Sequence, residues 1–244
     1  HIGKQQTVGG IRRSNHAKPE FEVITDVLNL SREMSFRCAV AGLSYGGACL
    51  GFQAPKSEEK TLVDLMGFLG YVIERYKVKW GIESGFTREE VGKLGEYASK
   101  LVTNKKQNAD LISTAAAYTV YVCIKEAVRF RYGKDDLQGK LIGIQGLGRI
   151  GSHLAELLLK EQAEIIASDT DSSQIQAFLK KQTPEVKKTI NTVSSTEIGM
   201  QMGHVFSPCG SSGVLSRDSI QTIGYHIIVG GANCLLKANT INEQ

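Results

Sequence analysis

A glycine-rich segment near the middle of the chain has the residue pattern with the clearest chemical meaning. It reads Gly146-Leu147-Gly148-Arg149-Ile150-Gly151 and lies between an apolar stretch and an amphipathic one. Glycines at this spacing allow a tight turn, close approach of a phosphate to bare backbone, and close packing of the following helix on a strand. The first turn of that helix would direct unpaired N–H groups at the phosphates. The segment therefore predicts a dinucleotide-binding site.

An aspartate follows the glycine segment at the distance that such a site requires. Asp169 ends the next apolar stretch, 18 residues beyond Gly151, close to the roughly 20 residues at which an acid meets a ribose hydroxyl. Its carboxylate would repel a 2′-phosphate, and residues 170–173 contain no arginine. This spacing favours NAD over NADP. The alternative is a glycine turn that caps a helix in an α/β domain of another kind.

The elements around these residues must form a parallel sheet if the site exists. Apolar strands are predicted over 141–145 and 163–168, joined by a helix over 152–160. The flanking elements are a long helix over 114–131, a helix over 173–181, and strands over 188–193, 203–207 and 225–230. Alternating strands and helices imply a doubly wound parallel sheet.

The first part of the chain predicts a separate, smaller α/β layer. Pro19 is placed to start a helix over 19–33 with a buried apolar face. The apolar residues at helical spacing are Phe21, Ile24, Val27, Leu28 and Leu30. Further predicted elements are a loop and buried strand over 39–52, a helix over 58–76, a short strand over 78–82, and a helix over 87–101. The polar segment 103–108 predicts the boundary between domains at residues 1–105 and 106–244.

Composition and charge narrow the classes of function. Of 244 residues, 41% are hydrophobic and 22% charged, as in ordinary soluble globular proteins. No uninterrupted apolar run approaches membrane-spanning length, and the first residues lack a signal-peptide pattern, so a cytoplasmic protein with no membrane partner is expected. The net charge is only +4, and the one basic and aromatic cluster, 129–132, ends a predicted helix. Nucleic acid is therefore not an expected partner.

The cysteines and histidines show no metal-binding pattern. The five cysteines are Cys38, Cys49, Cys123, Cys209 and Cys234. They are widely spaced, form no CxxC pair and have mostly apolar or small neighbours, which predicts reduced thiols in the core. The five histidines show no HxH, HxxxH or HExxH spacing. No metal is expected.

Short motifs along nearly the whole chain occur in an order that one family shares. They are Gly9-Gly10-Ile11-Arg12, the stretches 30–37, 41–49 and 136–140, Ser207-Pro208-Cys209-Gly210, and Gly231-Ala232-Asn233. Together they resemble the leucine, phenylalanine and valine dehydrogenases of the amino-acid dehydrogenase superfamily. The resemblance implies an α/β protein with a Rossmann-type doubly wound parallel sheet domain that binds NAD, over 106–244. It also implies a smaller α/β substrate domain of the dimerisation type, over 1–105.

The resemblance also implies an activity and a set of site residues. Members of this family use NAD to convert an L-amino acid into its 2-oxo acid and ammonia through an imine, and they are usually oligomeric. The implied substrate-binding residues are Gly9, Gly10, Arg37 and Asn233. The implied cofactor-binding residues are Gly146, Leu147, Gly148, Arg149, Ile150, Gly151, Asp169, Cys209, Gly210 and Asn233. The expected partners are a small-molecule substrate, an amino acid or oxo acid, and further copies of the chain.

Three positions depart from the family's polar chemistry. Arg37 stands at the lysine that holds the substrate carboxylate, and an arginine can still bind a carboxylate. Cys49 stands at the catalytic lysine that assists attack of water on the imine, and a thiol lacks that positive charge. Glu83 corresponds, at a shifted position, to the aspartate that transfers protons. Loss of such an acid–base group costs roughly 100- to 10,000-fold in rate.

Two functions therefore remain open. The first is an NAD-dependent oxidoreductase with an altered active site, acting on an amino acid, 2-oxo acid or related imine. The second is a catalytically inactive homologue that binds NAD or a metabolite as a sensor, scaffold or partner subunit, with Arg37, Cys49 and Glu83 as a surface arginine, a packed thiol and a solvated carboxylate. A redox module using Cys49 is disfavoured, because its neighbours do not indicate a reactive thiolate. The chain also begins after the family's opening strand and stops soon after Asn239, which indicates either truncation or missing terminal residues.

Overall fold

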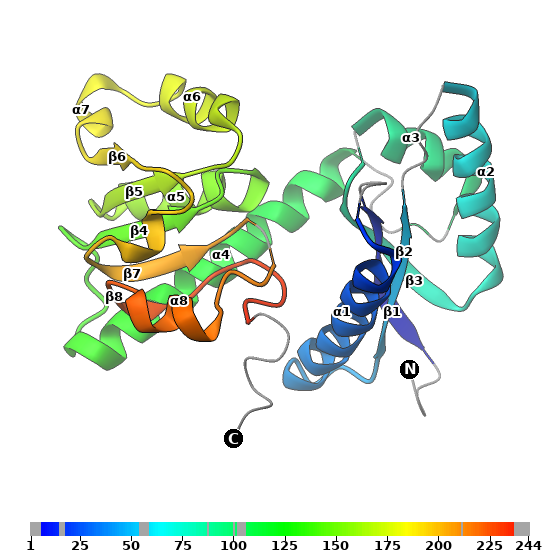
Figure 1. Cartoon of the computed structure of the whole chain (residues 1–244), viewed down its shortest axis with the longest axis horizontal. Helices are drawn as coiled ribbons and strands as arrows, with labels where there is room; N and C mark the ends of the chain where they lie inside the picture. Colours follow the sequence, from blue (N-terminus) through cyan, green and yellow to red (C-terminus); the bar gives the residue numbers. More distant parts are fainter. Residues whose placement is uncertain are drawn as a thin grey trace. The chain divides into compact units, whose positions relative to one another are not determined.

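The chain folds as two compact units, His1–Ala109 and Asp110–Gln244. A computed structural model (Figure 1) describes residues 6–14, 18–53, 59–86, 88–99, 101, 106–210 and 212–236. The division follows Ala109, close to the polar segment predicted as a linker. Helix α4 (Lys106–Tyr132) already begins inside that segment, so the helix predicted over 114–131 starts earlier than predicted. The roles assigned to the two domains remain predictions.

The first unit contains a three-stranded parallel sheet. Its strands are β1 (Thr7–Ser14), β2 (Gly46–Gln53) and β3 (Val78–Ser84), in the order β2-β1-β3. The sequence pattern predicts β2 and β3 but not the central strand β1. Its paired glycines, residues 9–10, are poor strand formers by themselves. Pairing with neighbours on both edges holds them in the sheet.

Helices pack on both faces of this sheet. They are α1 (Glu20–Val40), α2 (Glu59–Arg75) and α3 (Arg88–Tyr97). A Cβ on Gly47 would lie 2.1 Å from the Ser31 carbonyl oxygen, and one on Gly51 would lie 2.2 Å from Val27, so glycines let α1 press against β2. The other face meets α2 and α3 in a core of Ile11, Met66, Leu69, Ile73, Trp80, Leu94, Ala98 and Leu101.

The buried face of α1 differs from the predicted one. Phe21, Ile24 and Leu28 are 68%, 52% and 65% exposed, so their predicted burial is wrong. Val23 and Leu30 are the buried apolar residues in this part of the helix. Apolar residues occur at helical spacing on two faces of α1, and contact with β2 selects one of them. The helix also continues to Val40, beyond its predicted end.

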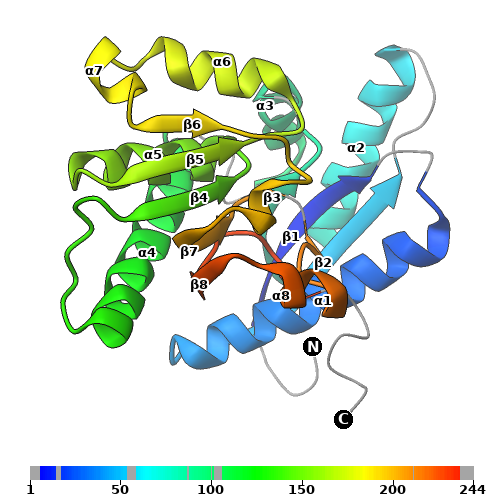
Figure 2. The same cartoon turned by 60° about the vertical axis from the view of Figure 1, so that its left-hand side comes forward.

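The second unit contains a five-stranded parallel sheet. Its strands are β4 (Leu141–Gln145), β5 (Glu164–Ser168), β6 (Ile190–Thr192), β7 (Gly203–Pro208) and β8 (Tyr225–Ile228). Figure 2 shows them side by side in the order β6-β5-β4-β7-β8. The chain starts at the centre, moves outward through β5 and β6, and returns to the other side of β4. This doubly wound α/β arrangement confirms the predicted fold class.

Helices cover both faces of this second sheet. They are α4, α5 (Arg149–Lys160), α6 (Ser172–Lys180), α7 (Pro184–Lys187) and α8 (Arg217–Thr222), with a 3₁₀ turn, η1 (Ile198–Met200). The main core packs α4 and α5 on the sheet through residues such as Ile124, Val128, Leu154 and Leu158. A smaller cluster on η1, α8 and the strands consists of Ile166, Ile198, Phe206, Leu215 and Tyr225.

Helix α4 has an unusually apolar composition. Residues Leu111–Tyr132 have a mean hydropathy of 1.3 in an 18-residue window, and are long and apolar enough to cross a membrane by that criterion. The criterion is weak evidence, since core helices of soluble proteins also meet it. Ala117, Ile124 and Val128 of this helix are fully buried in the core of the unit. Cys123, on the outer side, is exposed, so its prediction as a core thiol is wrong, whereas Cys38 is buried.

Candidate dinucleotide site

The glycine segment lies where the strand order of the second unit reverses. Gly146 follows β4 and Cys209 follows β7, the two strands on either side of the reversal. The N–H of Cys209 donates to the Gln145 carbonyl oxygen at 2.7 Å, which joins the two strand ends. In open α/β sheets the ligand crevice lies outside the carboxyl ends of the strands at such a point.

The three glycines of the segment meet different constraints. Gly146 has a φ of +97°, which favours glycine, and a Cβ there would lie 2.7 Å from the Gly210 backbone. A Cβ on Gly151 would lie 1.8 Å from the Gly146 carbonyl oxygen. A Cβ on Gly148 would meet no atom within 4 Å. The fold therefore requires the outer two glycines, whereas the middle one leaves open space of the kind that an approaching phosphate needs.

Helix α5 begins at this open space. Gly148 is its N-cap and supplies no side-chain cap, and the Ser152 N–H donates to the Gly148 carbonyl oxygen at 2.9 Å. The N–H groups of residues 149–151 precede this bond and have no acceptor within the helix. The helix dipole adds partial positive charge at the same end, and the Arg149 side chain there is exposed. These groups suit an anion such as a pyrophosphate.

Asp169 connects the end of β5 to the glycine segment. Its Oδ2 accepts from the Leu147 N–H at 2.7 Å, and its Oδ1 accepts from the Asp171 N–H at 2.9 Å. A carboxylate oxygen can accept more than one hydrogen bond, so Asp169 keeps capacity for a ribose hydroxyl. The N–H of Gly146 donates to the Ser168 carbonyl oxygen at 2.7 Å, which holds the turn against the same strand end.

The segment that follows β8 packs against the glycine segment and the end of β7. The Ala232 N–H donates to the Pro208 carbonyl oxygen at 2.9 Å. A Cβ on Gly231 would lie 3.0 Å from Ile150 and 3.8 Å from the Cys209 sulfur. Burial raises the pKa of the Cys209 thiol, which keeps it neutral at pH 7 and disfavours a nucleophilic role. The structure thus brings the predicted cofactor residues together, with Asn233 directly after Ala232.

The candidate residues of the first unit lie on different elements. Gly10 and Cys49 are register partners in β1 and β2, as are Gly9 and Ala48. Side chains alternate along a strand, so Cys49 shares with Gly47 and Gly51 the face of β2 that α1 covers. The thiol is half-buried there. This position is that of a side chain packed between a helix and a sheet.

Arg37 lies on α1 shortly before the start of β2, whereas Glu83 lies near the carboxyl end of β3. Arg37 is in the last turn of α1, half-exposed, and forms an ion pair of 3.2 Å with Glu33. Glu83 lies near the end of β3, where the pairing of β1 with β3 shifts register between Ile82 and Ser84. The catalytic and substrate-binding roles of the first-unit residues remain predictions.

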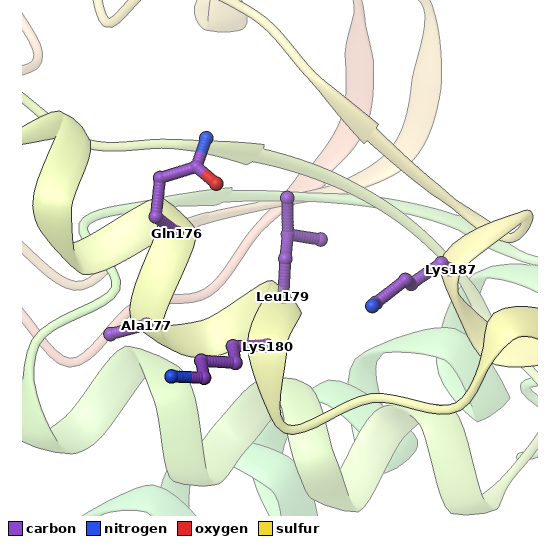
Figure 3. A pocket seen from close by; sticks show the side chains of 5 residues that line it. All are labelled: Gln176, Ala177, Leu179, Lys180 and Lys187. Carbon is purple, nitrogen blue, oxygen red and sulfur yellow. The ribbon is translucent and has the colours of Figure 1, made fainter.

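The described residues of the second unit line a hollow and a groove. One, of about 160 Å³, lies beside α8 and is lined in part by Gln145, Thr196 and Phe206. Gln145 Nε2 donates to the Ser195 carbonyl oxygen at 3.1 Å, but its buried Oε1 has no hydrogen-bond partner among the described residues. The other is an open groove of about 500 Å³ between α6 and α7. Figure 3 shows Lys187 pointing towards Leu179 across this groove and Lys180 pointing away.

The sequence interpretation missed Gln145. The available signal was a polar residue at the end of the apolar strand 141–145, immediately before the glycine segment. Its side-chain oxygen needs a donor from water or a ligand, since a buried acceptor without one is unfavourable. No group of three or more His, Cys, Asp or Glu residues within the described parts of the chain could hold a metal ion.

Several known proteins are similar to this chain in sequence and in fold. Residues 3–77 match the family profile described as "Glu/Leu/Phe/Val dehydrogenase, dimerisation domain". Phenylalanine dehydrogenase of Lysinibacillus sphaericus is 26% identical over 246 residues, which cover 97% of this chain and 64% of that protein. Valine dehydrogenase of Streptomyces virginiae is 26% identical over 233 residues, covering 93% and 63%. Over nearly its whole length the chain is therefore similar to members of the amino-acid dehydrogenase superfamily.

Solved structures of this superfamily show the same fold. The crystal structure of L-tryptophan dehydrogenase from Nostoc punctiforme has a TM-score of 0.66 at 24% identity, covering 97% of this chain and 65% of that one. Hetero-hexameric glutamate dehydrogenase from Thermus thermophilus has a TM-score of 0.69 at 18% identity, covering 94% and 61%. These likenesses confirm the predicted Rossmann-type α/β fold. The chain spans less than two thirds of the length of these relatives.

Proposed function

We propose that the protein is an NAD-dependent oxidoreductase that acts on an amino acid, a 2-oxo acid or a related imine. The observation that carries the proposal is the contrast within the glycine segment. Gly146 and Gly151 are closed in by backbone atoms, while Gly148 faces open space at the N-terminus of α5. This arrangement fits a pyrophosphate, and Asp169, which accepts a hydrogen bond from Leu147 of the glycine segment, would bind a ribose hydroxyl.

The residues that would hold NAD follow from this geometry. The N–H groups of residues 149–151 would bind the pyrophosphate, and Asp169 would select the unphosphorylated ribose. Cys209, Gly210 and Asn233 would lie beside the remainder of the cofactor. When bound, NAD supplies a carbon that accepts or donates a hydride. The protein's part is to position that carbon and exclude water from it.

The substrate class rests on the relatives, which are named as phenylalanine and valine dehydrogenases. Arg37 would bind the substrate carboxylate after leaving Glu33. That exposed pair contributes only roughly 0.3–0.5 kcal/mol, so breaking it costs little. Glu83 would transfer a proton. The side chain of Cys49 cannot supply the positive charge that the family's lysine gives to the imine step, because a sulfhydryl group has no cationic form at ordinary pH.

The second candidate is a homologue that binds NAD or a metabolite without turnover. The position of Cys49 favours it, because a half-buried residue on the β2 face covered by α1 has the surroundings of a packing side chain. Such a protein would serve as a sensor, scaffold or partner subunit.

One experiment separates the two candidates. A panel of amino acids and 2-oxo acids is assayed by NADH absorbance in both directions, beside a titration of NAD binding, with Gly148→Val as the control that lacks binding. Turnover by the unaltered protein supports the oxidoreductase. NAD binding without turnover, with activity gained only by Cys49→Lys, supports the binding protein. Absence of NAD binding in the unaltered protein would overturn the assignment of NAD as the cofactor in both candidate functions.

We also propose that the protein self-associates through α1. Phe21, Leu28 and Phe36 are 68%, 65% and 60% exposed along this helix, within the part of the chain that matches a dimerisation domain. Leu28→Glu should shift the protein to smaller species in sedimentation velocity. Met202→Glu, at an exposed position of the second unit, is the control that should leave the distribution unchanged. A cytoplasmic location remains a prediction from composition.

A further inference from the structure

The amino-terminal ends of β4, β7 and β8 carry a group of polar side chains away from the glycine segment. We call His204, His226, Tyr132 and Lys140 the imidazole cluster. The Tyr132 ring lies 5.8 Å from the His204 ring and 6.2 Å from the His226 ring, and the two imidazoles are 6.3 Å apart. Lys140 Nζ lies 5.3 Å from the Tyr132 ring. All four belong to the second unit.

The tautomer of His204 is fixed by the backbone. The Leu141 N–H donates to His204 Nδ1 at 3.0 Å, so Nδ1 carries no hydrogen. The neutral ring then carries its hydrogen on Nε2, and this nitrogen is a donor. A metal ion would need an unprotonated nitrogen, so the arrangement favours an acceptor ligand over a metal.

Tyr132 orients the second imidazole in a similar way. The Tyr132 hydroxyl and His226 Nδ1 are joined at 2.6 Å. When the hydroxyl donates, His226 also presents an Nε2–H. In the other neutral tautomer, Nδ1–H donates to the hydroxyl oxygen and Nε2 is an acceptor, so a bound anion would select the tautomer in which the hydroxyl donates. His204 and His226 occupy facing positions on β7 and β8, between the pairs Gly203–Tyr225 and Val205–Ile227, so both side chains lie on one face.

The charge around the imidazole cluster is mainly positive. Lys140 lies beside it, and Arg131 lies 5.8 Å from the Tyr132 ring. Glu164 at the start of β5 is the acidic group that acts on His204. Burial, then the charges of Lys140 and His226, lower the pKa of His204. The positive field that disfavours an imidazolium would attract an anion.

We propose that the imidazole cluster binds an oxyanion of the phosphate class through the Nε2–H groups of His204 and His226 and the Lys140 ammonium. The ligand is inorganic phosphate or the phosphate group of a metabolite. This site goes beyond the proposed function and is independent of it, because it lies at the opposite ends of the strands from the glycine segment. An anion there would bridge β4, β7 and β8 and tie the end of α4 to the sheet.

The first test is a histidine NMR titration of the whole chain. Inorganic phosphate, a phosphate monoester such as glycerol 2-phosphate, and chloride at matched ionic strength are compared. With about 20 mM phosphate and millimolar binding, the pKa of His204 should rise by roughly half a unit relative to chloride. His153, one turn into α5, reports separately on phosphate bound at the glycine segment. Tighter binding of the monoester would assign a metabolite, and equal binding would assign free phosphate. No rise beyond that in chloride would overturn the proposal.

Two variants distinguish binding from folding. His204→Asn keeps an acceptor for the Leu141 N–H but removes the Nε2 donor, and Lys140→Gln removes the ammonium. Each substitution should weaken the affinity for phosphate at least about five-fold. Lys140→Gln should leave the midpoint temperature of unfolding unchanged. Lys180→Gln, on α6, is the matched control and should bind phosphate normally. Unaltered phosphate affinity in both cluster variants would refute the site. In Gly148→Val, which should not bind NAD, phosphate should still raise the pKa of His204. Failure of the phosphate site can therefore be distinguished from failure of the proposed NAD site.

Discussion

The backbone N–H of Leu147 donates a hydrogen bond of 2.7 Å to Oδ2 of Asp169. The acid that is proposed to select the ribose therefore also holds the loop that is proposed to bind the pyrophosphate. Both functions depend on one carboxylate, although 22 residues separate the two positions.

Replacement of Asp169 separates these two roles. Asp169→Asn keeps an acceptor for the Leu147 N–H but loses the negative charge, whereas Asp169→Ala loses both. We expect NAD affinity to fall about ten-fold in the alanine variant, equivalent to ~1.4 kcal/mol, and discrimination against NADP to decrease in both. Titration of each variant with NAD and NADP measures these effects. An unchanged ratio of the two affinities would remove Asp169 from the ribose site.

Gly148 and Gly151 form a matched pair for the glycine segment. A Cβ on Gly151 would lie 1.8 Å from the Gly146 carbonyl oxygen, so Gly151→Ala should destabilise the fold by about 3 kcal/mol. A Cβ on Gly148 would meet open space, so Gly148→Val should cost no more than about 1 kcal/mol but abolish NAD binding. Denaturant unfolding and NAD titration of both variants provide the test. The reverse pattern would show that the open space does not serve a phosphate.

Tyr225 carries a hydroxyl that the fold leaves unsatisfied. The oxygen is buried without a hydrogen-bond partner among the described residues, and it lies where a Gly143 Cβ would approach within 2.3 Å. Tyr225→Phe should therefore raise the free energy of unfolding by about 1 kcal/mol. Phe206, stacked on this ring at 5.4 Å, keeps its contact in the variant. A loss of stability on urea unfolding would indicate a partner for the hydroxyl.

The same tyrosine gives an alkaline pH dependence. Burial raises the pKa of Tyr225 to about 12 from an ordinary value of 10.0. The unfolded chain loses its phenolic proton first, so this contribution to stability is complete below pH 10 and is lost as the pH rises towards 12. Stability curves of the unaltered protein and Tyr225→Phe should diverge over that interval. Parallel curves would contradict the raised pKa.

His204 gives a pH dependence on the acid side. Burial and the neighbouring charges of Lys140 and His226 lower its pKa, so the unfolded state binds the proton more readily. This contribution is complete above the unfolded pKa of about 6.5 and is lost as the pH falls through the lower folded pKa. In chloride buffer, His204→Asn should flatten the fall in unfolding free energy between about pH 7 and about pH 5. An equal slope in both proteins would assign the acid sensitivity to other groups.

The sequence by itself determined most local elements of the second unit and the doubly wound class of its sheet. The strand 141–145, the glycine segment and Asp169 form a pattern in which each residue type has a local conformational reason. The strand-helix alternation restricts the chain to a doubly wound sheet, because parallel crossovers have one favoured hand. In that topology the Gly146 N–H donates to the Ser168 carbonyl oxygen. Cys209 lies at the same edge of the sheet.

Only the tertiary structure decided which faces are buried and which distant groups meet. In α1 the helical period allowed Phe21 or Val23 to face inward, and contact with the glycines of β2 selected Val23. The central strand β1 exists because two neighbours supply its hydrogen bonds, which no local preference could indicate. The bond between Leu147 and Asp169 and the imidazole cluster likewise join residues far apart in the chain. Packing and hydrogen bonding act through space, whereas sequence periodicity records only the local conformational preferences of the chain.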